Sequence, residues 1–117
     1  MRTLRIATLV LAILAPLAAG HRPNAAAATT PSVTVHIMNF SFTPRSLAIP
    51  AGTTVTFVND DKEPHTVTAT DKSFDSDGLD LHQSWKHAFQ KSGAFAYYCE
   101  MHPYMKGKIV VTGARTP

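Results

Sequence analysis

The sequence predicts an all-β protein that folds as an antiparallel β-sandwich. Its 117 residues are enough for one domain. Beyond residue 30, seven short runs of strand-forming residues are separated by turn residues. No stretch in this part of the sequence has the apolar spacing of a convincing amphipathic helix. Strands must therefore form both of the layers that bury the core.

The seven runs follow one another with clear breaks. The first places Val33, Val35 and Ile37 on one face, and Pro44 follows its end. In chain order the runs span residues 32–40, 46–49, 53–59, 65–70, 84–89, 94–99 and 106–112. Much of the core is expected to come from six aromatic residues: Phe40, Phe57, Trp85, Phe89, Phe95 and Tyr97.

Residues 1–28 are predicted to be a secretory signal peptide with a flexible leader, and residues 29–117 the folded domain. Arg2 and Arg5 form a basic start, and the apolar stretch that ends at Leu17 is shorter than the roughly 20 residues of a membrane span. We therefore expect a periplasmic or secreted protein whose mature form has no membrane span. The alternative is an N-terminal anchor that stays attached.

The net charge of +3 comes from the predicted signal and leader. Without residues 1–28, the sequence has eight basic and eight acidic residues. Charged residues make up only 16% of the chain. This composition does not favour a nucleic-acid partner.

Side-chain alternation brings two metal-binding residue types to the inner face of the sandwich. Phe95, Tyr97 and Cys99 share one face of their strand, and the aromatic rings mark that face as the inner one. His65 likewise shares a face with Val67. Each of the two, His65 and Cys99, lies at a strand end, so they can meet.

The segment that begins at Cys99 carries the pattern Cys-x2-His-x2-Met, ending at His102 and Met105. With His65, the donors are two imidazoles, one thiolate and one thioether, the donor set of a blue-copper electron-transfer site. Zinc is a poorer match because thioether is a poor zinc ligand. Taken singly, each residue also has an ordinary interpretation: a buried thiol, a surface histidine or a core methionine.

These residues resemble the cupredoxins, the small blue-copper proteins, and within them the amicyanin and plastocyanin-like branch. The similar segments are NFSFTP at 39–44, GTTVTFVN at 52–59, PHT at 64–66 and GAFAYYC at 93–99. The resemblance implies an eight-stranded Greek-key sandwich with one type 1 copper ion, held by His65, Cys99, His102 and Met105. The eighth strand is then expected within residues 71–81.

The function expected from this resemblance is electron transfer by a monomer that cycles between Cu(II) and Cu(I). A c-type cytochrome or an exported dehydrogenase or oxidase would dock near His102. The alternative is a copper-binding module for copper buffering or delivery. An enzyme is not expected, because multicopper oxidases and nitrite reductases need further His-rich copper sites and this sequence has no His-x-His pair.

Several neighbouring residues are expected to support the copper site. Thr66 is a candidate for linking the two ligand-bearing loops, and Asn59 for fixing the loop before His65. The resemblance also implies that His102 reaches the surface inside a ring of apolar residues, formed by Pro64, Met101, Pro103 and Tyr104.

The remaining methionine and histidines are interpreted as non-ligands. Met101 lies too close to Cys99 in sequence to serve as the axial ligand. His87 is expected to be a core histidine with a hydrogen-bond partner, and His36 and His82 to be loop or surface residues.

Overall fold

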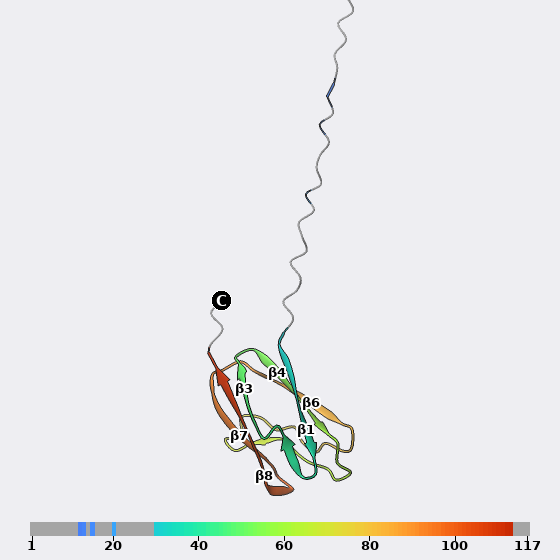
Figure 1. Cartoon of the computed structure of the whole chain (residues 1–117), viewed down its shortest axis with the longest axis vertical. Helices are drawn as coiled ribbons and strands as arrows, with labels where there is room; N and C mark the ends of the chain where they lie inside the picture. The colour runs from blue at the N-terminus through green and yellow to red at the C-terminus, as the bar shows by residue number, and fades with distance from the viewer. Residues whose placement is uncertain (1–11, 14, 16–19, 21–29, 114–117) are drawn as a thin grey trace, which may run out of the picture.

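The computed structural model describes residues 12, 13, 15, 20 and 30–113. Eight strands form two four-stranded sheets packed as a sandwich (Figure 1), which confirms the predicted fold class. The strands are β1 (Ser32–Met38), β2 (Ser41–Thr43), β3 (Ser46–Pro50), β4 (Thr53–Asn59), β5 (Thr68–Ala69), β6 (Ser84–Phe89), β7 (Gly93–Cys99) and β8 (His102–Thr112).

The strand order is β2-β1-β4-β6 in one sheet and β3-β8-β7-β5 in the other. Most neighbours are antiparallel, as predicted, but each sheet also has one parallel pair, β1 with β4 and β3 with β8. The β7–β8 pair ends at the register Cys99 opposite His102, after a bulge between Tyr98 and Cys99. The two metal-binding residues of this hairpin are therefore held at one end of the sandwich, away from the start of β1 and the end of β8 (Figure 1).

The prediction for the eighth strand was wrong. The additional strand is β2, which pairs with β1 through a hairpin. Asn39 and Phe40, with φ of 52° and 55°, adopt left-handed conformations that reverse the chain directly after β1. A new strand therefore begins before Pro44, between the predicted runs over 32–40 and 46–49, where a break was expected.

Residues 71–81 form a loop, and its β-type pairing is limited to the isolated bridges His65–Leu79 and Thr68–Asp75. Aspartate side chains satisfy backbone N–H groups within this loop: Asp71 accepts from Ser73 N at 2.9 Å, and Asp75 accepts from Asp77 N at 2.9 Å. Such local hydrogen bonds compete with a strand ladder. The predicted run over 65–70 is likewise reduced to the two residues of β5.

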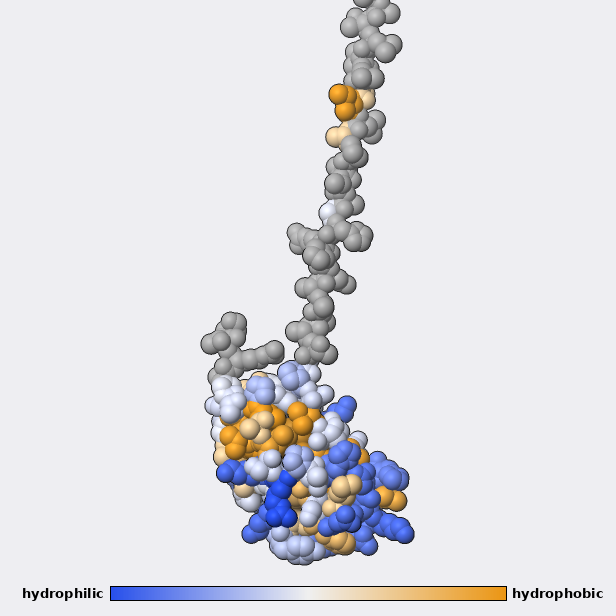
Figure 2. All heavy atoms as spheres, viewed as in Figure 1, coloured by the Kyte–Doolittle hydropathy of each residue, from blue (hydrophilic) through white to orange (hydrophobic). Residues whose placement is uncertain are grey.

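The core lies between the sheets and is built around aromatic edge-to-face contacts. The Tyr97 ring meets Phe42 at 4.7 Å and Phe57 at 5.5 Å between ring centroids. Of the six predicted aromatic core residues, Phe57, Phe89 and Tyr97 are buried, and the other three are half-buried against the core. Figure 2 is drawn from the same side as Figure 1 and shows hydrophobic residues gathered on this face near the end where Figure 1 labels β3 and β4.

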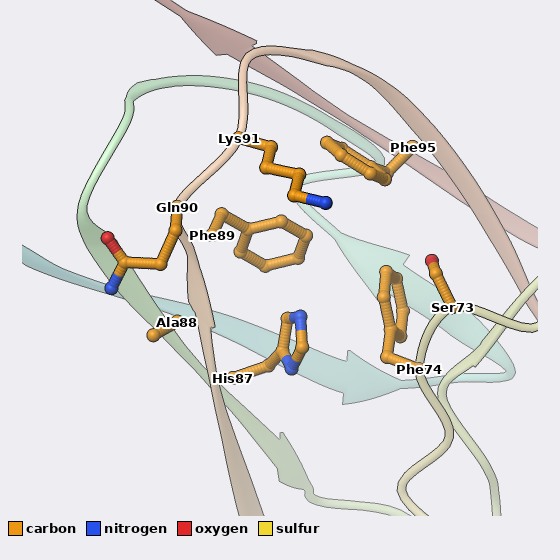
Figure 3. Close-up of a pocket in the computed structure, with 8 residues that line it drawn as sticks. All are labelled: Ser73, Phe74, His87, Ala88, Phe89, Gln90, Lys91 and Phe95. Carbon is orange, nitrogen blue, oxygen red and sulfur yellow. The ribbon is translucent and has the colours of Figure 1, made fainter. Parts of the chain in front are cut away.

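A cavity of about 260 Å³ opens at the edge of the sandwich between β6 and the 71–81 loop (Figure 3). His87 lines it together with Phe74 and Phe89, and its half-buried ring stacks on Trp85 at 5.3 Å and 16°. His87 therefore faces the aromatic interior as predicted, but aromatic contacts, rather than the expected hydrogen bond, hold its ring. His36 and His82 are exposed, as predicted.

Candidate metal centre

Two chain segments bring three donor atoms together at one end of the sandwich. His65 follows the turn after β4, Cys99 ends β7 and His102 begins β8. The Sγ atom of Cys99 lies 3.7 Å from Nδ1 of His65 and 3.6 Å from Nδ1 of His102, and the three ligand atoms all lie within 4.8 Å of one another. The predicted meeting of the inward His65 with the inward Cys99 is thus confirmed.

These separations suit a shared metal ion. A first-row metal with bonds of about 2.3 Å to sulfur and about 2.0 Å to nitrogen holds a sulfur and a nitrogen donor about 3.5–3.7 Å apart at tetrahedral or trigonal angles. His65 and Cys99 are fully buried and His102 is half-buried. The cluster is therefore dry on its inner side and reaches solvent only along the His102 ring.

The two methionines near the cluster differ sharply in exposure. Met105 on β8 is 2% exposed and belongs to the core, whereas Met101 is 46% exposed. A thioether that faces the interior beside a buried Cys and His can act as a weak metal ligand, but one that faces solvent is poorly placed to do so. The structure thus agrees with the choice of Met105 over Met101.

Asp61 orients His65, a role that the sequence analysis missed. Its Oδ2 lies 2.9 Å from Nε2 of His65 and also accepts a bond from the N–H of Phe40 at 2.9 Å, while Oδ1 accepts from Asn39 N at 2.8 Å. With Nε2–H donating to a carboxylate, Nδ1 of His65 is the free donor atom that faces Cys99. The available signal was a carboxylate four residues before His65, in the break between the runs over 53–59 and 65–70.

The hydrogen bonds that Asp61 accepts also lower its pKa. Burial alone would raise the pKa of Asp61, but the bonds from Phe40, Asn39 and His65 outweigh it, so the pKa lies below the usual 3.8. Asp61 is therefore an anion at neutral pH and a strong acceptor for the His65 ring.

Asn59 fixes the turn before His65, as predicted. Its Nδ2 donates to the carbonyls of Glu63 at 2.9 Å and Leu79 at 2.8 Å, and its Oδ1 accepts from Asp61 N at 2.9 Å. The side chain is fully buried, so each of these bonds replaces water that is absent there. One amide thus ties both ends of the turn to the 71–81 loop.

Thr66 links the two ligand-bearing segments, which confirms the prediction made for it. Its backbone N–H donates to Sγ of Cys99 at 3.3 Å, and its Oγ1 accepts from Glu100 N at 2.8 Å. Thr66 therefore fixes the Cys99 sulfur from one side and the following peptide from the other.

Phe40 packs against the metal cluster rather than deep in the core. Its ring meets His65 at 5.3 Å and 88°, and His102 at 5.0 Å and 86°. The four residues of the apolar ring expected around His102, namely Pro64, Met101, Pro103 and Tyr104, are all exposed. Tyr104 is 70% exposed, and its ring centroid lies 6.0 Å from that of His102.

A β-sandwich with one thiolate and two imidazoles at one end defines a mononuclear copper protein of the type 1 class. The sequence matches the family described as "Cupredoxin-like domain" over residues 6–111. The chain belongs to this cupredoxin family. The cluster of His65, Cys99, His102 and Met105 is its type 1 copper site, which takes one copper ion.

Among known relatives, the chain is similar to amicyanin-alpha of Methylorubrum extorquens, with 33% identity over 95% of this chain and 99% of the relative. A solved structure of an amicyanin variant in its Cu(I) form superposes with a TM-score of 0.66 at 26% identity, over 69% of this chain and 82% of that one. A copper-containing nitrite reductase from Thermus scotoductus gives a TM-score of 0.66 at 36% identity, over 71% of this chain but only 22% of the reductase.

Within the residues that the structure describes, no helix is long and apolar enough to cross a membrane. The predicted signal peptide and leader, residues 1–28, lie outside the described residues except for positions 12, 13, 15 and 20. That assignment stays a prediction.

Proposed function

We propose that the protein is an exported carrier of single electrons that cycles between Cu(II) and Cu(I). The observation that carries this proposal is the position of His102. It is the half-buried member of an otherwise buried donor cluster, and the segment around it carries the exposed apolar side chains of Met101, Pro103 and Tyr104. An electron can therefore pass along its ring to a partner while water stays away from the buried donors.

Copper would be held by Nδ1 of His65, Nδ1 of His102 and Sγ of Cys99, and the thioether of Met105 would be a weaker ligand. Copper, when bound, supplies the one-electron couple. The protein holds two of these ligands in place through hydrogen bonds to residues outside the cluster: His65 donates to Asp61, and Thr66 donates to the Cys99 sulfur. These two supports would hold His65 and Cys99 in one arrangement in either oxidation state.

The surface around His102 suits brief contact with a redox partner. Pro64, Met101, Pro103 and Tyr104 form the apolar collar, and weak electron-transfer complexes use small interfaces of this kind. We propose a c-type cytochrome or an exported dehydrogenase or oxidase as the partner, and a monomer as the working form. The likeness to a nitrite reductase covers about a fifth of that enzyme. It therefore supports a shared domain but gives no support for a catalytic activity of this protein.

The test is the rate of electron transfer between the copper-loaded protein and a soluble c-type cytochrome. Met101→Lys places a charge in the collar without touching a donor atom, so it should lower the bimolecular rate constant at an unchanged potential. Lys62→Met, a control outside the collar, should not lower it. Slow electron exchange combined with rapid loss of copper to a chelator would support copper buffering or delivery instead.

Export is tested separately by the mass of the protein recovered after expression with its leader. A periplasmic or secreted species that lacks at least the first 18 residues is expected, since residues 18–20 and 25–28 offer small side chains for cleavage. A full-length, membrane-bound chain would support the retained anchor.

A further inference from the structure

A chain of hydrogen bonds runs from the copper-binding hairpin to the long 71–81 loop. Glu100 N donates to Thr66 Oγ1 at 2.8 Å, Thr66 Oγ1 lies 3.0 Å from Thr68 Oγ1, and Thr68 Oγ1 donates to Asp75 Oδ1 at 3.2 Å. Thr66 is 5% exposed and Thr68 is 1% exposed, while Asp75 lies at the surface. A surface carboxylate is thus connected to the residue that follows Cys99 by two buried hydroxyl groups.

The direction of this chain follows from counting protons. Each threonine hydroxyl has one proton to donate, and an ionised carboxylate has none. Thr68 uses its proton on Asp75, so Thr68 accepts from Thr66. Thr66 then has its proton engaged, and its lone pair is left for the N–H of Glu100. All three bonds point toward Asp75, and bonds aligned in this way polarise one another.

The far end of the chain is itself held in place. The N–H of Asp77 donates to the same Oδ1 of Asp75 at 2.9 Å, and Ser76 N donates to Val67 O at 3.0 Å. Thr68 and Asp75 also form an isolated β-bridge. Asp75 is therefore fixed relative to β5 and cannot drift away from Thr68.

We propose that Thr68 and Asp75 are positioning residues of the copper site, which act on the Cys99 sulfur through Thr66. Thr66 touches Cys99 at two points, its N–H on Sγ and its Oγ1 on the next peptide. The chain from Asp75 keeps that second contact in place, and so keeps the N–H of Thr66 aimed at the sulfur. Hydrogen bonding around the Cys sulfur is one of the factors that set the potential of a blue-copper site.

The sign of the effect follows from the charge on sulfur. An N–H that donates to the thiolate withdraws electron density from it and so favours Cu(I) over Cu(II). Loosening Thr66 weakens this donation, and the potential should fall. The inference rests on the copper site alone, so it holds whether the protein carries electrons or stores copper.

The decisive comparison is between Thr68→Val and Thr68→Ser in the copper-loaded protein. Valine keeps the shape of threonine but has no hydroxyl, so it breaks the chain without changing the charge. We expect Thr68→Val to lower the midpoint potential and to shift the sulfur-to-copper absorption band of the Cu(II) form. Thr68→Ser keeps the hydroxyl and should restore both wild-type values.

A second readout follows the Glu100 amide by hydrogen exchange in the Cu(I) protein. Its exchange should become about tenfold faster in Thr68→Val and in Asp75→Ala, which is the loss expected for one weakened hydrogen bond. Asp77→Asn removes a neighbouring charge but keeps the backbone bond to Asp75, so it should leave this exchange unchanged. Equal potentials in Thr68→Val and Thr68→Ser, or unchanged Glu100 exchange in both chain-breaking variants, would overturn the proposal.

Discussion

Nε2 of His65 lies 2.9 Å from a carboxylate oxygen of Asp61, and the two residues are four positions apart in one turn. The same carboxylate group receives the N–H groups of Asn39 and Phe40. One anion therefore orients a metal-binding ring and also fixes the turn that places Phe40 against both histidines of the cluster. Through these bonds, Asp61 connects the turn that follows β4 to the Asn39–Phe40 turn that precedes β2.

Replacing Asp61 should weaken copper binding without removing a donor atom. Asp61→Ala removes the hydrogen-bond partner that orients the His65 ring, so the affinity for Cu(II) should fall about 10–100-fold. Competition with a chelator of known affinity measures this change. Asp60→Asn is the matched control, because Asp60 contacts His36 instead of a donor. An affinity unchanged in Asp61→Ala would show that packing alone orients His65.

The colour of the Cu(II) protein should depend on Cys99. Charge transfer from its sulfur to copper should make the wild-type protein intensely blue, and Cys99→Ser should abolish that absorption. The variant should still fold, because Cys99 is a small part of the core and a serine hydroxyl can accept the N–H of Thr66. An absorption spectrum and a circular dichroism spectrum of each protein are sufficient. A colourless copper complex of the wild-type protein would refute the ligand assignment.

The two methionines near the cluster provide a paired test of the axial ligand. Met105→Gln should keep a coloured site and lower the potential, because a harder oxygen donor favours Cu(II) more than a thioether does. Met101→Gln should leave the potential unchanged, since Met101 is exposed and outside the core. Voltammetry on both variants makes the comparison. If the Met101 variant shifts and the Met105 variant does not, the axial assignment is wrong.

The metal site was more predictable from the sequence than its supports. Cys99, His102 and Met105 lie within seven residues, so their proximity is a local property of one hairpin. The inward direction of His65 followed from strand alternation. Asp61 lies only four residues before His65, but its carboxylate is held by two left-handed residues, Asn39 and Phe40, that lie far from it in sequence.

The same limit explains the strand that was placed wrongly. β2 has only three residues and ends beside Pro44, so its own pattern is too short to separate it from a break. The 71–81 loop has enough residues for a strand, but its aspartates bind its own backbone instead. Both outcomes are decided by hydrogen bonds that a pattern of apolar residues does not describe.

Gly107 should be intolerant of even a methyl group. It lies opposite Tyr97 in the β7–β8 register, and a Cβ added there would overlap the Tyr97 ring. Tyr97 is 1% exposed and packed by Phe42 and Phe57, so it has no room to retreat. Gly107→Ala should lower the free energy of unfolding by about 1–3 kcal/mol. Chemical denaturation measures this, and Gly78→Ala, where nothing lies within 4 Å, is the control.

His87 should make the protein less stable in mild acid. Burial among aromatic rings lowers the pKa of His87 below its usual 6.5. As the pH falls below about 6.5, His87 becomes protonated in the unfolded chain but stays neutral in the folded protein. The free energy of unfolding therefore declines until the pH reaches the pKa of His87 in the folded protein. His87→Phe keeps a ring against Trp85 and Phe89 but cannot bind the proton. Its stability relative to wild type should therefore rise as the pH falls from about 7 to about 5, as measured by chemical denaturation of the copper-loaded proteins.

The exposed His82, whose φ of 67° suits asparagine, provides the control His82→Asn, for which no such rise is expected. The copper ligands are the same in all three proteins, so the protonation of these ligands cancels in the comparison. If the stability difference between His87→Phe and wild type does not change with pH, the His87 ring accepts its proton equally well in the folded and unfolded states, and the prediction is wrong.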